Sequence, residues 1–178
     1  MIIHGIQYTV NNNIEACNKS GMQKYPATPA TNLLDSVGAE YTKNLYDYNK
    51  SGAVAAAEIM EVSEHAMIKT LVMVDSDHKP FIVLMHGEKE TSLKDLARQL
   101  DTKNVRTASI DDAQKYTGYL VGGISPFGTR RELKVYAEKT ILQLPYIYIN
   151  GGRRGFILGM TPETLIKILD PTPVNVAR

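Results

Sequence analysis

The sequence predicts a mixed α/β fold of the α+β kind, with a mixed, largely antiparallel, barrel-like sheet and helices flanking it. Three observations support this class. Apolar segments come in pairs around turn residues, as Met67–Val74 and Pro80–Met85 do, which is the pattern of a β-hairpin. Segments with a capping Ser or Thr and one apolar side lie between the strand segments. Strands and helices do not alternate one by one, as they would in a doubly wound parallel sheet.

Five segments begin with the signals of a helix N-terminus. Thr28 can cap a helix that Pro29 opens and Gly38 ends. Capping boxes or alanine-rich composition predict the others. These are Ala53–Met60 behind Ser51, the segment from Ser92 and Asp95 to Leu100, the segment from Ser109 and Asp112 to Gly118, and the segment from Thr161 to Leu169.

β-branched and aromatic residues dominate most of the remaining segments, which predicts short strands. The expected strands are Gln7–Val10, Glu40–Tyr48, Met67–Val74, Pro80–Met85, Val105–Ala108, Tyr119–Val121, Leu133–Ala137, Tyr146–Ile149 and Phe156–Leu158. The last two flank N-G-G-R-R-G at Asn150–Gly155, which predicts a hairpin with a basic turn.

The chain of 178 residues is long enough for one domain with a sizeable core. Residues 1–27 are polar and irregular, and we interpret them as an N-terminal extension. Residues 28–170 form the predicted domain. Residues 171–178 contain two prolines and are expected to be a loose C-terminal tail.

Charge is unevenly distributed along the chain. The net charge is +1, but residues 115–178 hold nine Lys or Arg against four Asp or Glu, whereas residues 1–114 hold eleven against fifteen. A basic C-terminal third suits a polyanionic partner, although solvated charge is the commoner cause. Cys17 is the only cysteine, which excludes an internal disulfide. With no signal peptide and no long apolar run, we expect a cytoplasmic protein without membrane contact.

The glycine-rich stretch Thr117–Gly128 is the first candidate site. Gly122 and Gly123 allow the backbone to turn and to approach a ligand closely, and their amide N–H groups can point at an oxyanion or phosphate. Ser125 adds a hydroxyl, and Pro126 makes the turn rigid. The alternative is a simple connection between strands, followed by solvated arginines.

Lys69 is the most informative single residue. Strand alternation places it with Leu71 and Met73, while Ile68 and Val72 lie on the other face, so both faces are apolar. A lysine there either extends its ammonium to solvent from the strand end or lines a pocket in which its charge matters more. The residues by themselves leave both readings open.

Other chemistries have weaker support. The four histidines, His4, His65, His78 and His86, have no metal-ligand spacing, so we expect neither a metal nor another cofactor. Ser125 lies outside a G-x-S-x-G nucleophile elbow, which weakens the case for a serine hydrolase.

Three motifs together resemble the YbaK/EbsC family of freestanding aminoacyl-tRNA deacylases, which are related to the editing insertion of bacterial prolyl-tRNA synthetases. They are Lys69-Thr70-Leu71, the stretch T-G-Y-L-V-G-G-I-S-P at Thr117–Pro126, and Y-I-N-G-G-R-R-G at Tyr148–Gly155. The resemblance covers roughly Thr28 to Leu169 and implies a mixed, barrel-like sheet with flanking helices. Departures are residues 1–27, which many members lack, and Tyr48-Asn49, where a histidine and an acidic residue are frequent.

The resemblance implies a role for each matching residue. Lys69 stands where the family has its essential pocket lysine, and Gly122, Gly123 and Ser125 match the loop that holds the aminoacyl carbonyl and terminal ribose. The implied substrate-binding residues are Tyr46, Ile124, Pro126 and Glu138. The basic residues expected to contact tRNA phosphates are Arg130, Arg131, Arg153 and Arg154.

The implied activity is hydrolysis of a mischarged aminoacyl-tRNA, with Cys-tRNA(Pro) as the first substrate and Ala-tRNA(Pro) as an alternative. An aminoacyl ester is already activated, so orientation and oxyanion stabilisation can dominate the catalysis. The expected partners are the acceptor end of tRNA and, as a second candidate, prolyl-tRNA synthetase. A non-catalytic module that binds a tRNA end or nucleotide is the rival from another class. The oligomeric state stays open.

Overall fold

The computed structural model describes residues 24–48 and 53–178, and its helices begin where capping side chains predict them. Thr28, Ser92, Ser109 and Thr161 each accept a hydrogen bond from a backbone N–H three residues ahead. The helices are α1 Pro29–Ser36, α2 Ala53–Ile59, α3 Leu93–Gln99, α4 Ile110–Thr117 and α5 Pro162–Leu169, and two short 3₁₀ turns are η1 Glu64–Ala66 and η2 Ile141–Gln143. The predicted strand at Gln7–Val10 and the cap at Ser51 lie outside the described residues.

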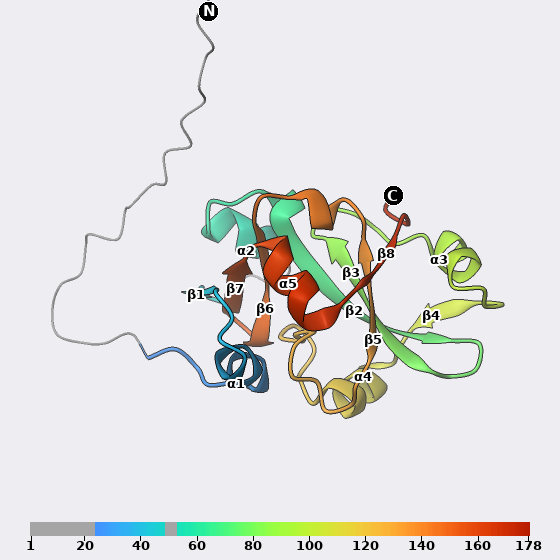
Figure 1. The fold of residues 1–178 in the computed structure, drawn as a ribbon, viewed down its shortest axis with the longest axis horizontal. Helices are drawn as coiled ribbons and strands as arrows, with labels where there is room; N and C mark the ends of the chain where they lie inside the picture. Colours follow the sequence, from blue (N-terminus) through green and yellow to red (C-terminus); the bar gives the residue numbers. More distant parts are fainter. Residues whose placement is uncertain (1–23, 49–52) are drawn as a thin grey trace, which may run out of the picture.

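One mixed sheet organises the molecule (Figure 1). Its strands are β1 Thr42–Leu45, β2 Met67–Asp75, β3 Pro80–His86, β4 Val105–Thr107, β5 Lys134–Glu138, β6 Ile147–Arg153, β7 Phe156–Met160 and β8 Thr172–Val174. The order is β1-β7-β6-β2-β3-β5-β8, and β4 also pairs with β2. Pairings β1–β7, β6–β7, β2–β3 and β2–β4 are antiparallel, whereas β2–β6, β3–β5 and β5–β8 are parallel. The predicted fold class is confirmed.

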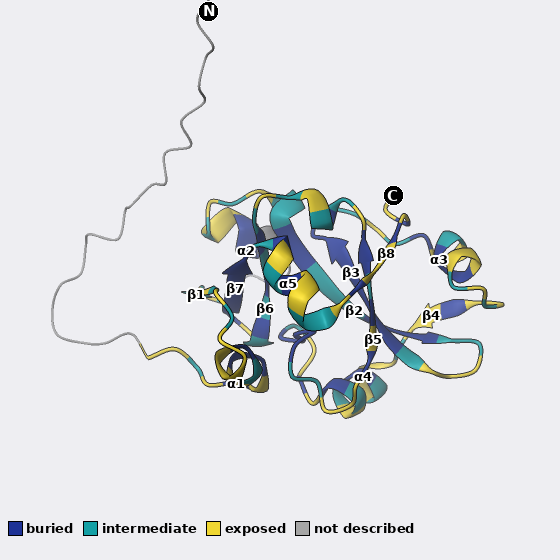
Figure 2. Cartoon of the chain, in the orientation of Figure 1, coloured by how far each residue is buried: buried dark blue, intermediate teal, exposed yellow. Residues whose placement is uncertain are grey.

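Two hydrophobic clusters lie on opposite faces of the central hairpin β2–β3. Ile68 and Val72 belong to one cluster, and Met73 belongs to the other, as the alternation along β2 predicts. Figure 2 shows this burial as dark strands at the centre, with exposed residues along the outer sides of the helices. No helix that the structure describes is both long and apolar enough to cross a membrane.

The expected strand Tyr119–Val121 is wrong, because this segment is a loop. Gly118 ends α4 in the left-handed conformation (φ 79°) and redirects the chain. The buried Tyr119 donates a hydrogen bond from its hydroxyl to the Phe127 carbonyl (2.7 Å) and so closes the loop on itself. Leu120 is 66% exposed. Tyr119 thus anchors the loop in the core and Leu120 faces solvent, and the segment 119–121 pairs with no strand of the described sheet.

The expectation of a loose tail after residue 170 is also wrong. β8 pairs with β5 in parallel register, and Val174 and Val176 are buried in the second cluster. Glu138 Oε2 accepts hydrogen bonds from the backbone N–H groups of Val176 (2.7 Å) and Ala177 (2.9 Å). Glu138 is itself buried, so it holds the C-terminal segment in place and is not among the residues of the cavity described below.

The edge of β2 that faces away from β3 is split. It pairs with β6 only at Met67 and Ile68, and with β4 only from Met73 onward. Residues 69–71 therefore have no strand partner on this edge within the described part of the chain. A gap in a sheet edge exposes backbone and side chains of the same strand to a ligand, and Lys69 lies in this gap.

Candidate active site

A cavity of about 250 Å³ opens at the split edge of β2. Distant parts of the chain contribute to it: the segment after β1, α2, β2, the glycine-rich loop and the β6–β7 hairpin. Its lining residues are Tyr46, Tyr48, Ala56, Met67, Ile68, Lys69, Thr70, Leu71, Val121, Gly122, Ile124, Asn150 and Ile157. Most of these side chains are apolar, so the few polar groups among them define what the cavity can bind.

Lys69 supplies the one charged side chain of this lining. It is half-buried, and its Nζ donates a hydrogen bond to the Lys89 carbonyl (2.6 Å). Burial lowers the pKa of its ammonium below the ordinary value, while the carboxylates of Glu88 and Glu90 act in the opposite direction. Of the two readings that the sequence leaves open, the structure favours the pocket lysine.

Two lining residues carry buried oxygen atoms without a hydrogen-bond partner among the described residues. They are Thr70 Oγ1 and Asn150 Oδ1. Buried polar atoms are nearly always hydrogen-bonded, so two buried oxygens without a described partner are unusual beside this cavity. Sequence reasoning missed both residues, although each stands inside a motif that it used. The available signal was a polar residue in an otherwise apolar strand.

Two tyrosines, Tyr46 and Tyr48, also line the cavity. The Tyr46 backbone N–H donates to the Gly155 carbonyl (2.9 Å), which ties the segment after β1 to the β6–β7 hairpin. Burial raises the pKa of the Tyr46 hydroxyl, so it stays protonated and can donate a hydrogen bond. Tyr48 lies under the Arg154 guanidinium, 5.4 Å from ring centroid to Cζ. Tyr46 therefore lines the cavity, where the sequence analysis expects it. Tyr48 lines it too, and the sequence analysis does not name it as a site residue.

The glycine-rich loop contributes fewer groups than expected. Gly122, with φ 91°, and Ile124 line the cavity. The Gly123 amide N–H is directed elsewhere, because it donates to the Leu120 carbonyl (3.0 Å) and closes a turn. Ser125 is fully buried, and its Oγ accepts a hydrogen bond from the Phe127 N–H (3.4 Å). Pro126 is buried too. Neither Ser125 nor Pro126 lines the cavity. Gly123, Ser125 and Pro126 therefore shape the loop.

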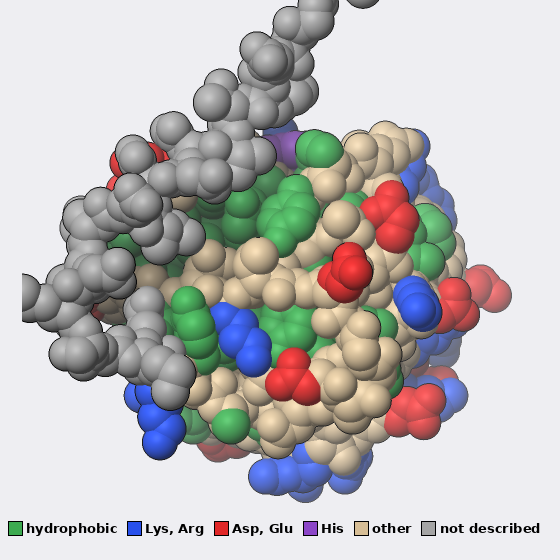
Figure 3. Space-filling view, turned by 60° about the vertical axis from the view of Figure 1, so that its left-hand side comes forward, with side chains coloured by type: hydrophobic (Ala, Val, Ile, Leu, Met, Phe, Trp, Pro, Cys, Tyr) green, Lys and Arg blue, Asp and Glu red, His purple; other side chains and the backbone are tan. Residues whose placement is uncertain are grey.

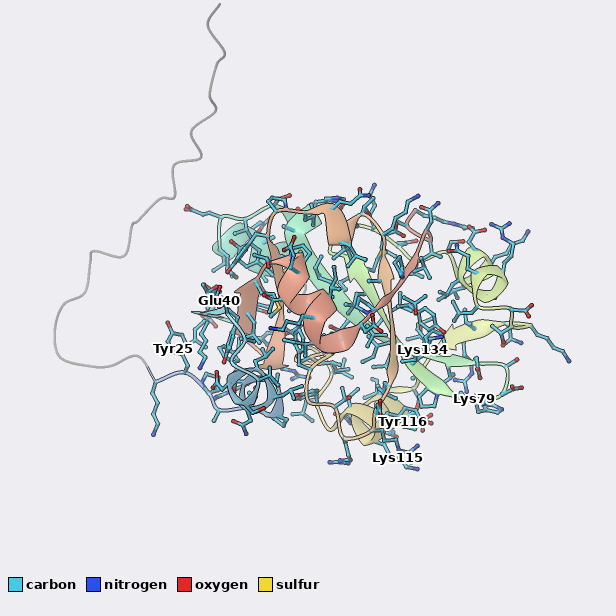
Figure 4. All side chains as sticks on the ribbon, in the orientation of Figure 1. Tyr25, Glu40, Lys79, Lys115, Tyr116 and Lys134 are labelled. Atoms are coloured by element: carbon cyan, nitrogen blue, oxygen red, sulfur yellow. The ribbon has the colours of Figure 1, made fainter. Side chains whose placement is uncertain are left out.

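The four arginines differ in their surroundings. Arg154 Nε donates to the Val121 carbonyl (2.9 Å) and braces the loop at the mouth of the cavity. Arg131 lies over the Tyr116 ring of α4 at 5.1 Å, and Arg130 packs along Gly118. Arg153 is exposed. Figure 4 shows Lys115 and Tyr116 together on α4, and Figure 3 shows Lys and Arg side chains at separate places on one face.

His86 is the most buried titratable group near the cavity. Its Nδ1 donates to the His65 carbonyl (2.6 Å), and its Nε2 accepts from the Thr140 hydroxyl (2.7 Å), which fixes the neutral tautomer. Burial lowers the pKa of the His86 imidazole below its ordinary value.

In the described part of the chain no three His, Cys, Asp or Glu side chains gather as a metal site requires.

We expect folding stability to fall between pH 7.5 and pH 5.5 because of His86. Its pKa is lower in the folded chain than in the unfolded chain, so the unfolded chain binds more protons as the pH drops past the ordinary histidine pKa of about 6.5. Urea unfolding at the two pH values measures the loss. His86→Gln should show a smaller loss than wild type, and His78→Asn, at an exposed turn, should match wild type. An undiminished loss in His86→Gln would contradict the assignment.

Comparisons of the chain with known proteins agree on one family. The family model of the aminoacyl-tRNA editing domain matches residues 48–168 of this chain. The chain is similar to a candidate Cys-tRNA(Pro)/Cys-tRNA(Cys) deacylase, EbsC, of Enterococcus faecalis, with 29% identity over 65% of this chain and 71% of that protein. It is also similar to a proline–tRNA ligase of Lactobacillus gasseri, with 29% identity over 56% of this chain but only 18% of the ligase.

The fold has solved relatives as well. A candidate trans-editing enzyme for prolyl tRNA synthetase aligns with a TM-score of 0.75 and 20% identity, over 84% of this chain and 95% of that one. This likeness supports the fold alone, whereas the family match covers most of the chain and includes Lys69, the glycine-rich loop and the β6–β7 hairpin. The predicted enzyme class, aminoacyl-tRNA deacylase, agrees with these findings. The chain belongs to the family of aminoacyl-tRNA editing domains.

Proposed function

We propose that the chain hydrolyses mischarged tRNA in trans, with Cys-tRNA(Pro) as its first substrate. The observation that carries the proposal is the cavity at the split edge of β2, with one ammonium in a mostly apolar lining and, beside it, two buried oxygens that have no hydrogen-bond partner among the described residues. Its volume of about 250 Å³ lies below the range of roughly 300–1,000 Å³ for sites that hold drug-sized ligands. A small aminoacyl group matches that volume.

The Lys69 ammonium is the group in this cavity that can oppose the negative charge that develops on the ester carbonyl oxygen. The Gly122 N–H has no hydrogen-bond partner in the described part of the chain and is a second donor for the same oxygen. A small displacement of the lining would bring the buried Thr70 Oγ1 or Asn150 Oδ1 within reach of the substrate amine. Hydrolysis breaks the bond between the acyl carbon and the ribose oxygen, and water supplies the hydroxyl to the acid and the proton to the ribose.

The attacking group comes from the substrate or from water in this proposal. None of the lining residues is a histidine, a carboxylate, a serine or a cysteine, which are the commonest general bases and nucleophiles of hydrolases. The substrate thiol can attack the acyl carbon and release the ribose hydroxyl, which leaves a cyclic thioester that water then hydrolyses. Otherwise a bound water attacks the acyl carbon, and a neighbouring ribose hydroxyl takes part by passing the proton of that water to the leaving ribose oxygen. This substrate-assisted scheme demands orientation more than it demands reactive side chains.

A deacylation panel tests the proposal. Purified protein is incubated with tRNA(Pro) charged with Cys, Ala or Pro, and the loss of aminoacyl ester is followed over time. We expect the fastest hydrolysis with Cys-tRNA(Pro) and none above background with Pro-tRNA(Pro). Preference for Ala-tRNA(Pro) would retain the enzyme class and replace the substrate. Binding of all three without hydrolysis would favour the non-catalytic tRNA-end module.

The chain spans only a small part of the proline–tRNA ligases that it matches, so tRNA selection is a separate proposal. We propose that prolyl-tRNA synthetase supplies part of this selection as a partner. The addition of synthetase should then lower the KM for Cys-tRNA(Pro) without changing kcat. An unchanged KM would show that the chain selects its tRNA by itself.

Neutralising Arg130 and Arg131 together should raise the KM for aminoacyl-tRNA and flatten its dependence on salt. Each phosphate contact releases counterions, so its loss removes about one unit from the slope of log binding constant against log salt. Both side chains lie outside the cavity lining, so a minimal aminoacyl-nucleotide should be hydrolysed at the wild-type rate. An equal loss on both substrates would instead assign the two arginines to loop structure.

A further inference from the structure

The turn after β3 holds the Lys69 ammonium. The Lys89 N–H donates to the His86 carbonyl (3.2 Å), which closes the turn 86–89, and the Lys89 carbonyl accepts from Lys69 Nζ (2.6 Å). β2 begins and β3 ends at the same end of the sheet, so this turn lies beside the start of the strand that carries Lys69 (Figure 1). The direction of the lysine side chain therefore depends on the conformation of the turn.

A cluster of polar contacts fixes that turn. Glu88, within the turn, contacts His65 with its carboxylate (Oε1 to Nδ1, 2.6 Å). The His65 ring stacks on the His86 ring with a centroid separation of 3.7 Å and an interplanar angle of 11°. His86 is tied to the His65 backbone and to Thr140, as described above. η1, the turn and the start of η2 are thus linked at one place.

Glu88 also affects the charge of Lys69 directly. The Lys69 ammonium is partly desolvated, and the carboxylates whose charges favour it are Glu88 and Glu90. The titratable neighbours of Lys69 on the cavity side are the phenol groups of Tyr46 and Tyr48, and the lining contains no carboxylate. Glu88 differs from Glu90 because its position is fixed by a partner, His65.

We propose that Glu88 is a positioning residue for Lys69: paired with His65, it fixes the turn 86–89 so that the Lys89 carbonyl holds the ammonium at the cavity. The proposal rests on the proposed function, in which Lys69 stabilises the ester oxyanion. Within the described residues Glu88 has no hydrogen bond or ion pair with a lining residue, and it acts on the site through the turn that holds Lys69.

Glu88→Gln should lower kcat for Cys-tRNA(Pro) about tenfold and leave KM within about twofold, because the loss concerns the transition state and not the binding of tRNA. The alkaline limb of the pH–rate profile should move to lower pH, since Lys69 loses a carboxylate that favours its charged form. Glu58→Gln on α2 is the matched control, because it removes the same charge from an exposed position without a side-chain contact to Lys69 or Glu88.

His65→Asn removes the partner and leaves the Glu88 charge. It should lower kcat, and the double variant His65→Asn/Glu88→Gln should be no worse than Glu88→Gln, because both changes break one unit. Additive losses would overturn the positioning role, and so would a loss of the same size in Glu58→Gln. Equal melting temperatures across the set would confirm that no variant simply unfolds.

Titration of the Lys69 side chain by NMR, with carbon-labelled lysine, separates this proposal from the proposed function. Lys69→Ala assigns the signal, and Glu88→Gln should shift the titration midpoint of Lys69 to lower pH relative to wild type and Glu58→Gln. An unshifted midpoint would overturn the proposal even if the enzyme is active. A shifted midpoint in a protein that hydrolyses none of the tested tRNAs would support Glu88 and refute the proposed function.

Discussion

Lys69→Ala should reduce deacylation of Cys-tRNA(Pro) about 100-fold or more, while the melting temperature changes by only a few degrees. Loss of one oxyanion-stabilising donor typically costs a factor of 10² to 10³ in rate. Lys69 lies at the split edge of β2, and its side-chain bond is to a loop carbonyl, so the core loses little on truncation. Single-turnover hydrolysis at saturating enzyme measures the chemical step without the contribution of tRNA binding.

Two further lysine variants sharpen this result. Lys69→Arg should restore little activity, because the guanidinium is planar and bulkier than the ammonium and is a poor match for a cavity built around it. Lys79→Ala is the matched control, since it removes the same charge from the exposed turn between β2 and β3 (Figure 4). Wild-type turnover in Lys69→Ala would make this lysine structural and would move the site elsewhere.

Gly123→Ala should destabilise the fold by about 1 to 3 kcal/mol and abolish most activity. A Cβ at this position would lie 2.8 Å from the backbone atoms Arg153 C and Arg154 N, so the loop and the β6–β7 hairpin would have to separate. Those two segments form adjoining walls of the cavity. Chemical unfolding gives the free energy, and the deacylation assay gives the activity.

Gly38→Ala is the control for Gly123→Ala. Gly38 has φ 65° but no atom within 4 Å of an added Cβ, so it should lose only the conformational cost of about 1 kcal/mol and keep its activity. Gly122→Ala should behave differently again, because the added Cβ would collide with the Tyr48 hydroxyl. Tyr48→Phe in that background should recover part of the stability. If Gly123→Ala kept full activity, the close contact between loop and hairpin would be irrelevant to the site.

The helix starts were predictable because their causes are local. A capping side chain and the N–H groups that it satisfies lie within three residues of one another, as for Thr28 and Ser109. The two faces of β2 were predictable for a similar reason, since alternation is a property of the strand itself. Lys69 departs from that pattern in the sequence itself, and the motif order around it resembles the family to which the chain belongs.

The site could not be assembled from such local signals. By sequence the Gly123 amide is a plausible oxyanion donor, but in the structure it donates its hydrogen bond to the Leu120 carbonyl. Glu138 is expected to bind substrate, but its carboxylate accepts hydrogen bonds from the C-terminal backbone. Both outcomes depend on which backbone atoms come close after folding, and pattern and spacing contain no information about that. Loop glycines and buried carboxylates are therefore poorly assigned from sequence.

Local patterns in the chain determined its helix starts, the faces of its strands and the lysine of the candidate site. Tertiary structure decided where β2 loses its partner and why Thr70 and Asn150 have buried oxygens without a hydrogen-bond partner among the described residues. It also decided how Glu88 and His65 come to flank the turn that holds Lys69. The physical reason is the range of the interactions. Caps and alternation act between residues close in sequence, whereas strand pairing, cavity closure and burial of polar groups join segments tens of residues apart.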